Sequence, residues 1–165
     1  MRQLRFSLVS LFILFLSSSL YANTQKHTLQ VSGDLGMFVA SDGLDASFDF
    51  AIEPEFFIID NLSASFRFDV TAGDLDSVTL AGRVRYYLDI PNHEKWSVYF
   101  GAGVGVLINL DGPNFADHSL PVVGFQYDFS DHIKIGSDFS FDILLNGDST
   151  AIGARIMPVQ FRWAF

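Results

Sequence analysis

The 165-residue chain contains no cysteine, few basic residues and, after residue 16, no long apolar run. Without cysteine, neither disulfides nor a thiolate metal site can form. Ten Lys and Arg stand against 19 Asp and Glu, for a net charge of −9. This balance excludes the basic stripe of a nucleic-acid-binding protein. A membrane helix needs roughly 20 consecutive apolar residues, so the chain must bury its apolar groups in another way.

The first 22 residues have the pattern of a secretory signal peptide. Arg2 and Arg5 precede an apolar run at residues 6–16, and mostly small residues follow up to Ala22. This order of basic, apolar and small segments predicts cleavage after Ala22. The alternative, an uncleaved anchor helix, is disfavoured because the apolar run is too short to span a bilayer. We therefore expect a signal peptide at 1–22 and one domain at 23–165. Loss of Arg2 and Arg5 changes the net charge from −9 to −11.

The remaining sequence is rich in apolar residues that alternate with polar ones. The whole chain is 49% hydrophobic and contains 18 Phe. In LSASFRFDVT, residues 62–71, every second side chain is apolar, which is typical of a strand with two different faces. Several connections are too short for parallel crossovers. We expect eight antiparallel strands, at residues 28–40, 46–58, 62–72, 78–89, 96–108, 119–129, 133–143 and 152–165.

Two architectures fit eight alternating strands. A soluble barrel or sandwich turns its apolar face inward, whereas a membrane barrel turns it outward. An eight-stranded barrel encloses only enough space for side chains, and the apolar set contains more aromatic residues than this space could hold. The sequence therefore predicts an all-β fold, an eight-stranded antiparallel up-and-down transmembrane β-barrel.

In such a barrel the polar faces line the lumen. The strand parity places there Asp34, Glu53, Arg67, Arg83, Arg85, Asp128, Lys134, Asp138, Asp142 and Arg162. Three-residue hairpin loops at 59–61 and 130–132 would set Glu53 opposite Arg67 and Asp128 opposite Lys134. Unpaired charges in a narrow lumen are costly, so we expect a salt-bridge network that closes it.

The same parity predicts small residues beside the arginines and one charge on the lipid side. Arg83 and Arg85 would face Gly103 and Gly101, with Asp34 or Asp138 nearby. Arg155 would point toward lipid near the outer interface, where a long side chain can reach the phosphates.

Three stretches carry a family resemblance: IEPEFFIIDNLSASFRF at 52–68, RVRYYLDI and WSVYFGAGVGV within 83–106, and the terminal FRWAF. They resemble the OmpX-like and OmpA-transmembrane-domain-like outer membrane β-barrel family. The resemblance implies a Gram-negative outer membrane location with both termini in the periplasm. It also implies contact with lipid and lipopolysaccharide, and a terminal aromatic strand that the barrel-assembly machinery reads. Phe161, Trp163 and Phe165 would form that signal, although Gly153 departs from the usual spacing before it.

No residue constellation indicates an enzyme. A lipid-deacylating barrel would need His and Ser two residues apart on one strand, whereas His118 and Ser119 are adjacent and would point to opposite sides. A serine nucleophile also needs a base held by a third group, and none can be assembled. We expect no catalytic activity, no cofactor and no resident metal.

The predicted outer loops are short and acidic. They contain no Lys or Arg and seven carboxylates, namely Asp42, Asp45, Asp74, Asp76, Asp111, Asp117 and Asp148. These residues fit solvated Asp-Gly turns, or a rim that gathers divalent cations through oxygen ligands. We expect a monomeric integral outer membrane protein with a structural or surface-interaction role. The main alternative is a narrow, porin-like passive channel for small solutes; a lipid-modifying enzyme or an adhesin is less favoured.

Overall fold

A computed structural model of the protein describes residues 29–40, 46–73, 76–147 and 149–165, and within them eight strands form one closed antiparallel barrel. The strands are β1 Leu29–Ala40, β2 Ala46–Ile59, β3 Leu62–Ala72, β4 Ser77–Ile90, β5 His93–Asn109, β6 Phe115–Asp128, β7 Ile133–Asn146 and β8 Ser149–Ala164. The predicted signal peptide lies outside the described residues. No helix among the described residues is long and apolar enough to cross a membrane.

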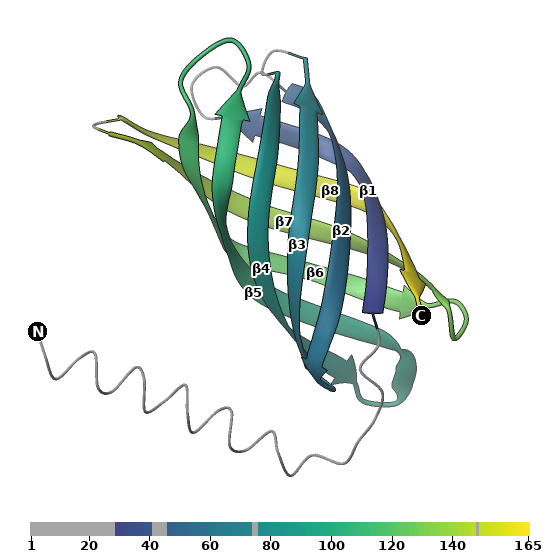
Figure 1. Cartoon of the computed structure of the whole chain (residues 1–165). Helices are drawn as coiled ribbons and strands as arrows, with labels where there is room; N and C mark the ends of the chain where they lie inside the picture. The colour runs from purple at the N-terminus through teal and green to yellow at the C-terminus, as the bar shows by residue number, and fades with distance from the viewer. Residues whose placement is uncertain (1–28, 41–45, 74–75, 148) are drawn as a thin grey trace, which may run out of the picture.

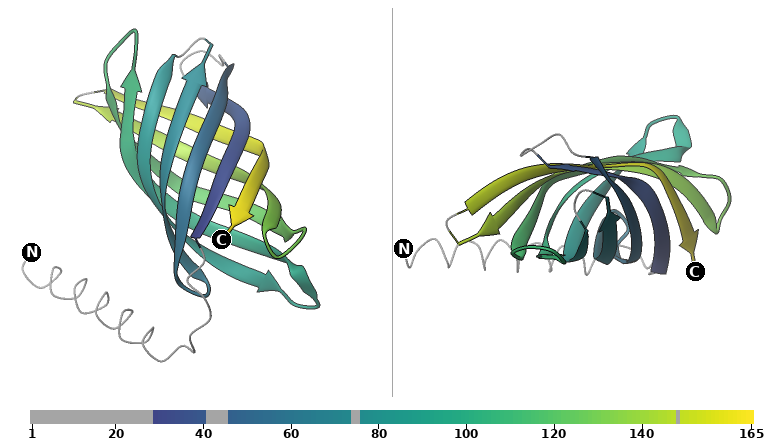
Figure 2. Two further views of the ribbon diagram at one scale, coloured as in Figure 1. Left: turned by 45° about the vertical axis from the view of Figure 1, so that its right-hand side comes forward. Right: turned by 90° about the horizontal axis from the view of Figure 1, so that it is seen from above.

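The barrel closes where the last strand meets the first. Gln30 of β1 stands opposite Ala164 of β8, and the Phe165 backbone N–H donates to the Leu29 carbonyl at 2.9 Å. Figures 1 and 2 show the yellow β8 beside the purple β1, with the other tilted strands following in chain order. Closure leaves no unpaired sheet edge.

The two ends of the barrel differ in the connections that they carry. We call the opening where β1 begins and β8 ends the terminal mouth. It also carries the connections β2–β3, β4–β5 and β6–β7. The opposite end, with the other connections, is called the loop end.

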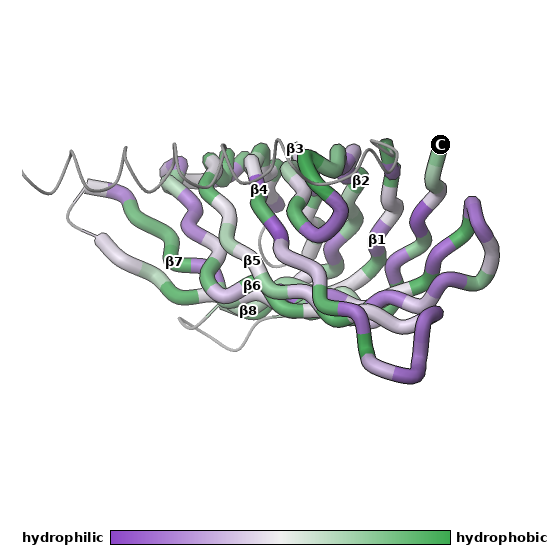
Figure 3. Tube along the Cα trace, turned by 90° about the horizontal axis from the view of Figure 1, so that it is seen from below, coloured by the Kyte–Doolittle hydropathy of each residue, from purple (hydrophilic) through white to green (hydrophobic). Residues whose placement is uncertain are grey.

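Residues that alternate in the sequence point alternately into the lumen and away from the barrel. Figure 3 shows hydrophilic and hydrophobic residues alternating along the strands. In β2 the burial pattern alternates over nearly the whole strand, with Glu53 only 1% exposed and Phe56 46% exposed. Because successive side chains of a strand point to opposite faces, one face of each strand lines the lumen and the other surrounds the barrel.

The outer surface is apolar and the interior is charged. Large apolar side chains that are at least 36% exposed occur on all eight strands, including Phe48, Phe66, Phe100, Phe141 and Phe161. A water-soluble protein rarely exposes a continuous apolar surface of this extent. The arrangement is that of a transmembrane β-barrel, and it confirms the predicted fold class.

A β-bulge in β8 overturns part of the predicted register. Leu35 pairs with Val159 but Met37 pairs with Ile156, so two residues of β8 lie opposite Gly36 alone. A β-carbon on Gly36 would collide with the backbone of Ile156 and with Met157, so the missing side chain makes room for the extra residue. A bulge reverses the parity of every residue beyond it, which brings Arg155 to the inside.

A second bulge occurs in β6. Gly101 pairs with Val122 and Gly103 with Ser119, so Leu120 and Pro121 together stand opposite one residue of β5. Both bulged residues are exposed on the outer face. Proline cannot donate to a strand ladder and is tolerated at bulges. The bulge allows Val122 and Ser119 to face the lumen, although they are an odd number of residues apart.

Some strand boundaries differ from prediction by three or four residues; β5 and β6, for example, begin three and four residues earlier than the expected 96 and 119. At these ends the ladder continues although the apolar alternation has stopped, so hydrophobic patterning could not reveal it. In the β2–β3 hairpin a register shift after Phe57 pairs Ile59 with Leu62. The loop is therefore two residues, not three.

Candidate functional site

The lumen is the chemically distinctive part of the described chain. Thirteen charged side chains line it, each no more than 3% exposed as a residue. They comprise five arginines and eight carboxylates, namely Arg67, Arg83, Arg85, Arg155, Arg162, Asp34, Asp49, Glu53, Glu55, Asp69, Asp117, Asp138 and Asp142. Buried charges persist only when they are paired and hydrogen-bonded, and the contacts below form three connected clusters.

The central cluster is organised around Glu53. Its Oε2 lies 2.8 Å from Arg85 Nη2, 3.5 Å from Arg67 Nη1 and 3.7 Å from Arg83 Nη1. Asp138 bridges on the other side, at 3.3 Å from Arg85 and 3.7 Å from Arg83. One carboxylate on β2 and one on β7 therefore hold two neighbouring arginines of β4 across the lumen.

Arg67 extends this cluster to two further strands. Its Nη1 lies 2.8 Å from Asp34 of β1, and its Nε lies 2.8 Å from Asp69 on its own strand. All three side chains are 0% exposed. Charge-assisted hydrogen bonds of this length are among the stronger ones in proteins.

A second cluster lies toward the terminal mouth, around Arg162. Its Nη1 contacts Glu55 at 3.1 Å, the Tyr87 hydroxyl at 2.6 Å and Gln126 Oε1 at 3.1 Å. Its Nη2 contacts the Tyr99 hydroxyl at 3.1 Å and Gln160 Oε1 at 2.9 Å. These partners come from β2, β4, β5, β6 and β8, so this arginine connects five strands across the lumen.

The third cluster lies toward the loop end, around Arg155. Its Nη1 contacts Asp142 at 2.7 Å and Asp117 at 3.2 Å, and its Nε lies 3.2 Å from Asp49 and 3.5 Å from Asp69. Its Nη2 donates to the Thr79 hydroxyl at 3.0 Å. The single positive charge of Arg155 thus partly compensates the negative charges of four carboxylates.

Two groups of buried apolar and aromatic side chains also lie in the lumen. Phe38, Leu107 and Leu144 form a buried group toward the loop end, and the Arg155 guanidinium stands 5.0 Å from the centre of the Phe38 ring. Toward the terminal mouth the buried group comprises Phe57, Tyr87, Tyr99 and Val122. Each group touches a charged cluster, because Phe38 contacts Arg155 and both tyrosines contact Arg162.

Glycines leave the space that these large side chains occupy. A β-carbon at Gly103 would lie 2.8 Å from Arg83 Cγ. At Gly124 it would collide with the Tyr99 ring, and at Gly153 with the Phe38 ring. The predicted pairings of Arg83 with Gly103 and of Arg85 with Gly101 are present in the β4–β5 ladder.

The structure places the ten predicted lumen residues in two environments. Eight belong to the buried clusters. Asp128 and Lys134 lie instead at the terminal mouth, where their side chains are 39% and 16% exposed and pair at 3.1 Å. The expected contact of Glu53 with Arg67 is present, and Arg83 and Arg85 both reach Asp138 rather than Asp34.

Two predicted positions were wrong. Arg155 does not face lipid but is 1% exposed inside the lumen, because the β8 bulge reverses its parity. Asp117 does not belong to an outer rim. It is 1% exposed on β6, which begins at Phe115, and it binds Arg155. Of the other rim residues, Asp76 and Asp111 are exposed at the loop end, while Asp42, Asp45, Asp74 and Asp148 lie outside the described residues.

Sequence reasoning also missed Glu55 and the polar partners of Arg162. Glu55 shares the parity of Glu53, so alternation alone could have found it. Tyr87 and Gln160 share the inward parity of Arg85 and Arg162, but they carry no charge, so nothing marked them as partners of an arginine. The aromatic residues of the last strand, Phe161, Trp163 and Phe165, lie on the outer surface with exposed fractions of 48%, 45% and 68%.

Comparison with known proteins supports the fold. No protein-family model and no curated protein sequence matches this chain. Neisserial surface protein A (NspA) is 13% identical, with a TM-score of 0.66 over 84% of this chain and 96% of its own. The N-terminal β-barrel domain of Pseudomonas aeruginosa OprF is 12% identical, with a TM-score of 0.57 over 86% of this chain and 100% of its own.

A third solved structure gives the same result. The attachment invasion locus protein Ail of Yersinia pestis is 12% identical, with a TM-score of 0.55 over 86% of this chain and 100% of its own. At this level of identity the likeness concerns the fold. It confirms that the chain has the architecture of small outer membrane β-barrels, as the sequence resemblance implied.

Proposed function

We propose that the protein is a monomeric integral outer membrane protein with a structural or surface-interaction role, and that its lumen is closed to solutes. Its fold is shared with small outer membrane barrels, and its apolar exterior fits a lipid environment.

The proposal of a closed lumen rests on the burial of the arginines in the clusters. Four of them are each at most 1% exposed, namely Arg67, Arg85, Arg155 and Arg162. Their guanidinium groups cross the interior and contact carboxylates on other strands. A water-filled pore of a porin leaves such groups solvated. Breaking several buried ion pairs at once would be needed to open this interior, which is costly.

Planar-bilayer recording tests the closed lumen. Purified protein should insert without producing stable conductance steps, and flotation with lipid vesicles should verify the insertion. Arg85→Ser provides a matched variant, because it removes a long side chain between Glu53 and Asp138 and should raise conductance. Stable, uniform conductance of the unaltered protein would refute closure.

Stable conductance of the unaltered protein would support the second candidate function, a narrow passive channel. The eight carboxylates exceed the five arginines inside the described lumen, so such a channel would favour cations. Reversal potentials in a salt gradient would show this preference.

We further propose that a signal peptide is removed after Ala22, that the barrel-assembly machinery inserts the barrel, and that the terminal mouth faces the periplasm. The loop end would then contact lipopolysaccharide. The absence of cysteine makes orientation measurable: in intact cells a membrane-impermeant maleimide should label Asp111→Cys and leave His93→Cys unlabelled. The reverse pattern would invert the proposed topology.

We also propose that the protein has no catalytic activity. His118 lies on the outer face of β6, whereas Ser119 is buried on the inner face. The two side chains therefore cannot act on one substrate. Incubation with radiolabelled lipopolysaccharide should leave its acyl chains intact, and released fatty acid would contradict this proposal.

A further inference from the structure

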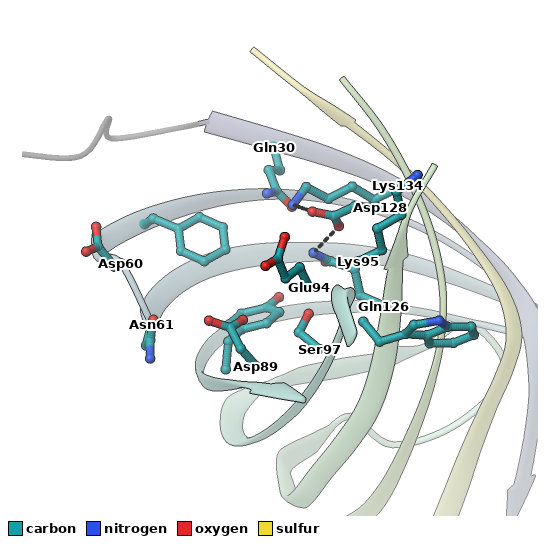
Figure 4. Close-up of a pocket in the computed structure, with 13 residues that line it drawn as sticks. Gln30, Asp60, Asn61, Asp89, Glu94, Lys95, Ser97, Gln126, Asp128 and Lys134 are labelled. Carbon is teal, nitrogen blue, oxygen red and sulfur yellow. Dashed lines mark hydrogen bonds and ion pairs between the residues drawn. The ribbon is translucent and has the colours of Figure 1, made fainter. Parts of the chain in front are cut away.

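A cavity of about 670 Å³ opens at the terminal mouth, below the buried aromatic layer. Its walls come from the β2–β3 turn and from every strand except β3 and β8. Figure 4 shows the labelled polar side chains gathered around one space. This volume lies within the range of small-molecule binding sites, roughly 300–1,000 Å³.

The wall contains a buried hydrogen-bond acceptor without a donor. Gln30 is 2% exposed and lines the cavity, and its Oε1 has no hydrogen-bond partner. The neighbouring amide of Gln126 is already used, since its Oε1 accepts from Arg162 and its Nε2 donates to Asp128. A buried acceptor left without a donor is unfavourable. A ligand bearing N–H groups would satisfy it.

The cavity also has an excess of carboxylates. Asp60, Asp89 and Glu94 line it and form no ion pair within the described part of the chain. Asp128 is paired with Lys134, and Lys95 is the one other cation of the lining. A concave site lined mainly by negative charges concentrates cations. Charge and the unsatisfied acceptor therefore point to the same ligand chemistry, a cationic N–H donor.

The spacing of the charges and the aromatic floor argue for an organic cation. Among the described residues no three His, Asp or Glu side chains are close enough to hold a metal ion. Phe57 and Tyr87 form the floor, with ring centres 5.2 Å apart, and Trp96 lies on the wall. Apolar rings between separated carboxylates suit a molecule whose ammonium groups are joined by alkyl segments.

We propose that the terminal mouth binds a linear alkyl polyamine. One ammonium group donates to Gln30 Oε1, the alkyl segments lie on the Phe57 and Tyr87 rings, and the remaining ammonium groups meet Asp89, Glu94 and Asp60. Two residues of the cavity wall, Tyr87 and Gln126, also contact Arg162 of the second cluster. Ligand binding is measured without conduction, so this proposal and the closed lumen can fail separately.

Calorimetric titration of the folded, full barrel in detergent micelles tests this site with spermidine as the probe. An exposed ion pair contributes a factor of about 1.5–5 in affinity. Spermidine, with three ammonium groups, should therefore bind about 10-fold more tightly than butylamine, which has one. Mg²⁺ alone should bind more weakly than spermidine, because it cannot use the aromatic floor.

Four variants assign the binding to named groups. The triple variant Asp60→Asn, Asp89→Asn, Glu94→Gln should weaken spermidine binding about 30-fold, and Gln30→Leu about 5-fold. Lys95→Gln should strengthen it about 2-fold by removing a like charge. Asp111→Asn neutralises one carboxylate at the loop end, away from the cavity, and should leave binding unchanged.

The proposal is overturned if spermidine does not bind, if Mg²⁺ binds as tightly, or if Asp111→Asn weakens binding as much as a mouth variant. Gel migration before and after boiling should verify that each variant is folded. A gain of affinity in Lys95→Gln cannot result from misfolding, so it supports the site independently of the weakened variants.

Discussion

Replacing Arg155 by methionine tests the buried network where the structure departs most from the sequence pattern. The substitution keeps an unbranched side chain but removes the charge that contacts Asp142, Asp117, Asp49 and Asp69 at 2.7–3.5 Å. At an effective dielectric constant of ~20, unit charges ~3 Å apart attract by about 5 kcal/mol. Most of each attraction offsets the cost of removing both ions from water.

The net loss on breaking a buried ion pair is about 3–5 kcal/mol, because uncompensated charges remain. With a urea dependence of ~2 kcal/mol per molar, the unfolding midpoint should fall by about 2 M. Unfolding in detergent micelles can be followed by the fluorescence of the two tryptophans and by gel migration. A lipid-facing Arg155 would give the opposite result, since methionine there would be neutral or stabilising.

A second substitution supplies the control. In the unaltered protein Asp142→Asn removes a partner of Arg155 and should destabilise the barrel. In the Arg155→Met background the same change removes a carboxylate that has lost its arginine and should restore stability. This change of sign follows only if the two residues are coupled. Equal destabilisation by Asp142→Asn in both backgrounds would refute the reasoning.

Two further predictions concern packing and assembly. Gly103→Ala should cost about 1–3 kcal/mol of unfolding free energy, measured in urea, because its β-carbon would lie 2.8 Å from Arg83 Cγ. Gly82→Ala, where a β-carbon meets nothing within 4 Å, should leave the midpoint unchanged, and equal effects would contradict the packing argument. Deletion of Phe165 should reduce the fraction of heat-modifiable barrel in membranes, because its backbone closes the β1–β8 junction. Phe129→Ala removes another exposed phenylalanine, 65% exposed at the same mouth, and should assemble normally; normal assembly without Phe165 would exclude its role as a signal.

The strand number and the identity of the two faces could be predicted because they depend on a local property. Alternation is visible within one strand, as at Phe66, Arg67 and Phe68, and needs no knowledge of the neighbours. Short connections between strands imply antiparallel neighbours. Pairs next to a hairpin could be predicted for the same reason, and Asp128 does meet Lys134.

The register beyond a bulge could not be read in this way. Pro121 lies at a bulge, yet Pro54 of β2 causes no register shift and pairs with Val31 in an unbroken ladder. Proline alone is therefore an ambiguous signal. The β8 bulge is accommodated by Gly36, which is distant in sequence, so the two strands must be considered together.

The sequence by itself determined that this chain is a barrel with an apolar exterior and a charged interior, since hydrophobic alternation sets both faces of each strand. Only the tertiary structure decided which charges meet away from the hairpins. Arg155 changes sides through one extra residue opposite Gly36, and its four carboxylates come from β2, β3, β6 and β7. The cavity at the terminal mouth likewise depends on six strands and a turn. Such groupings arise from closure of the sheet, which brings together residues that no local pattern connects.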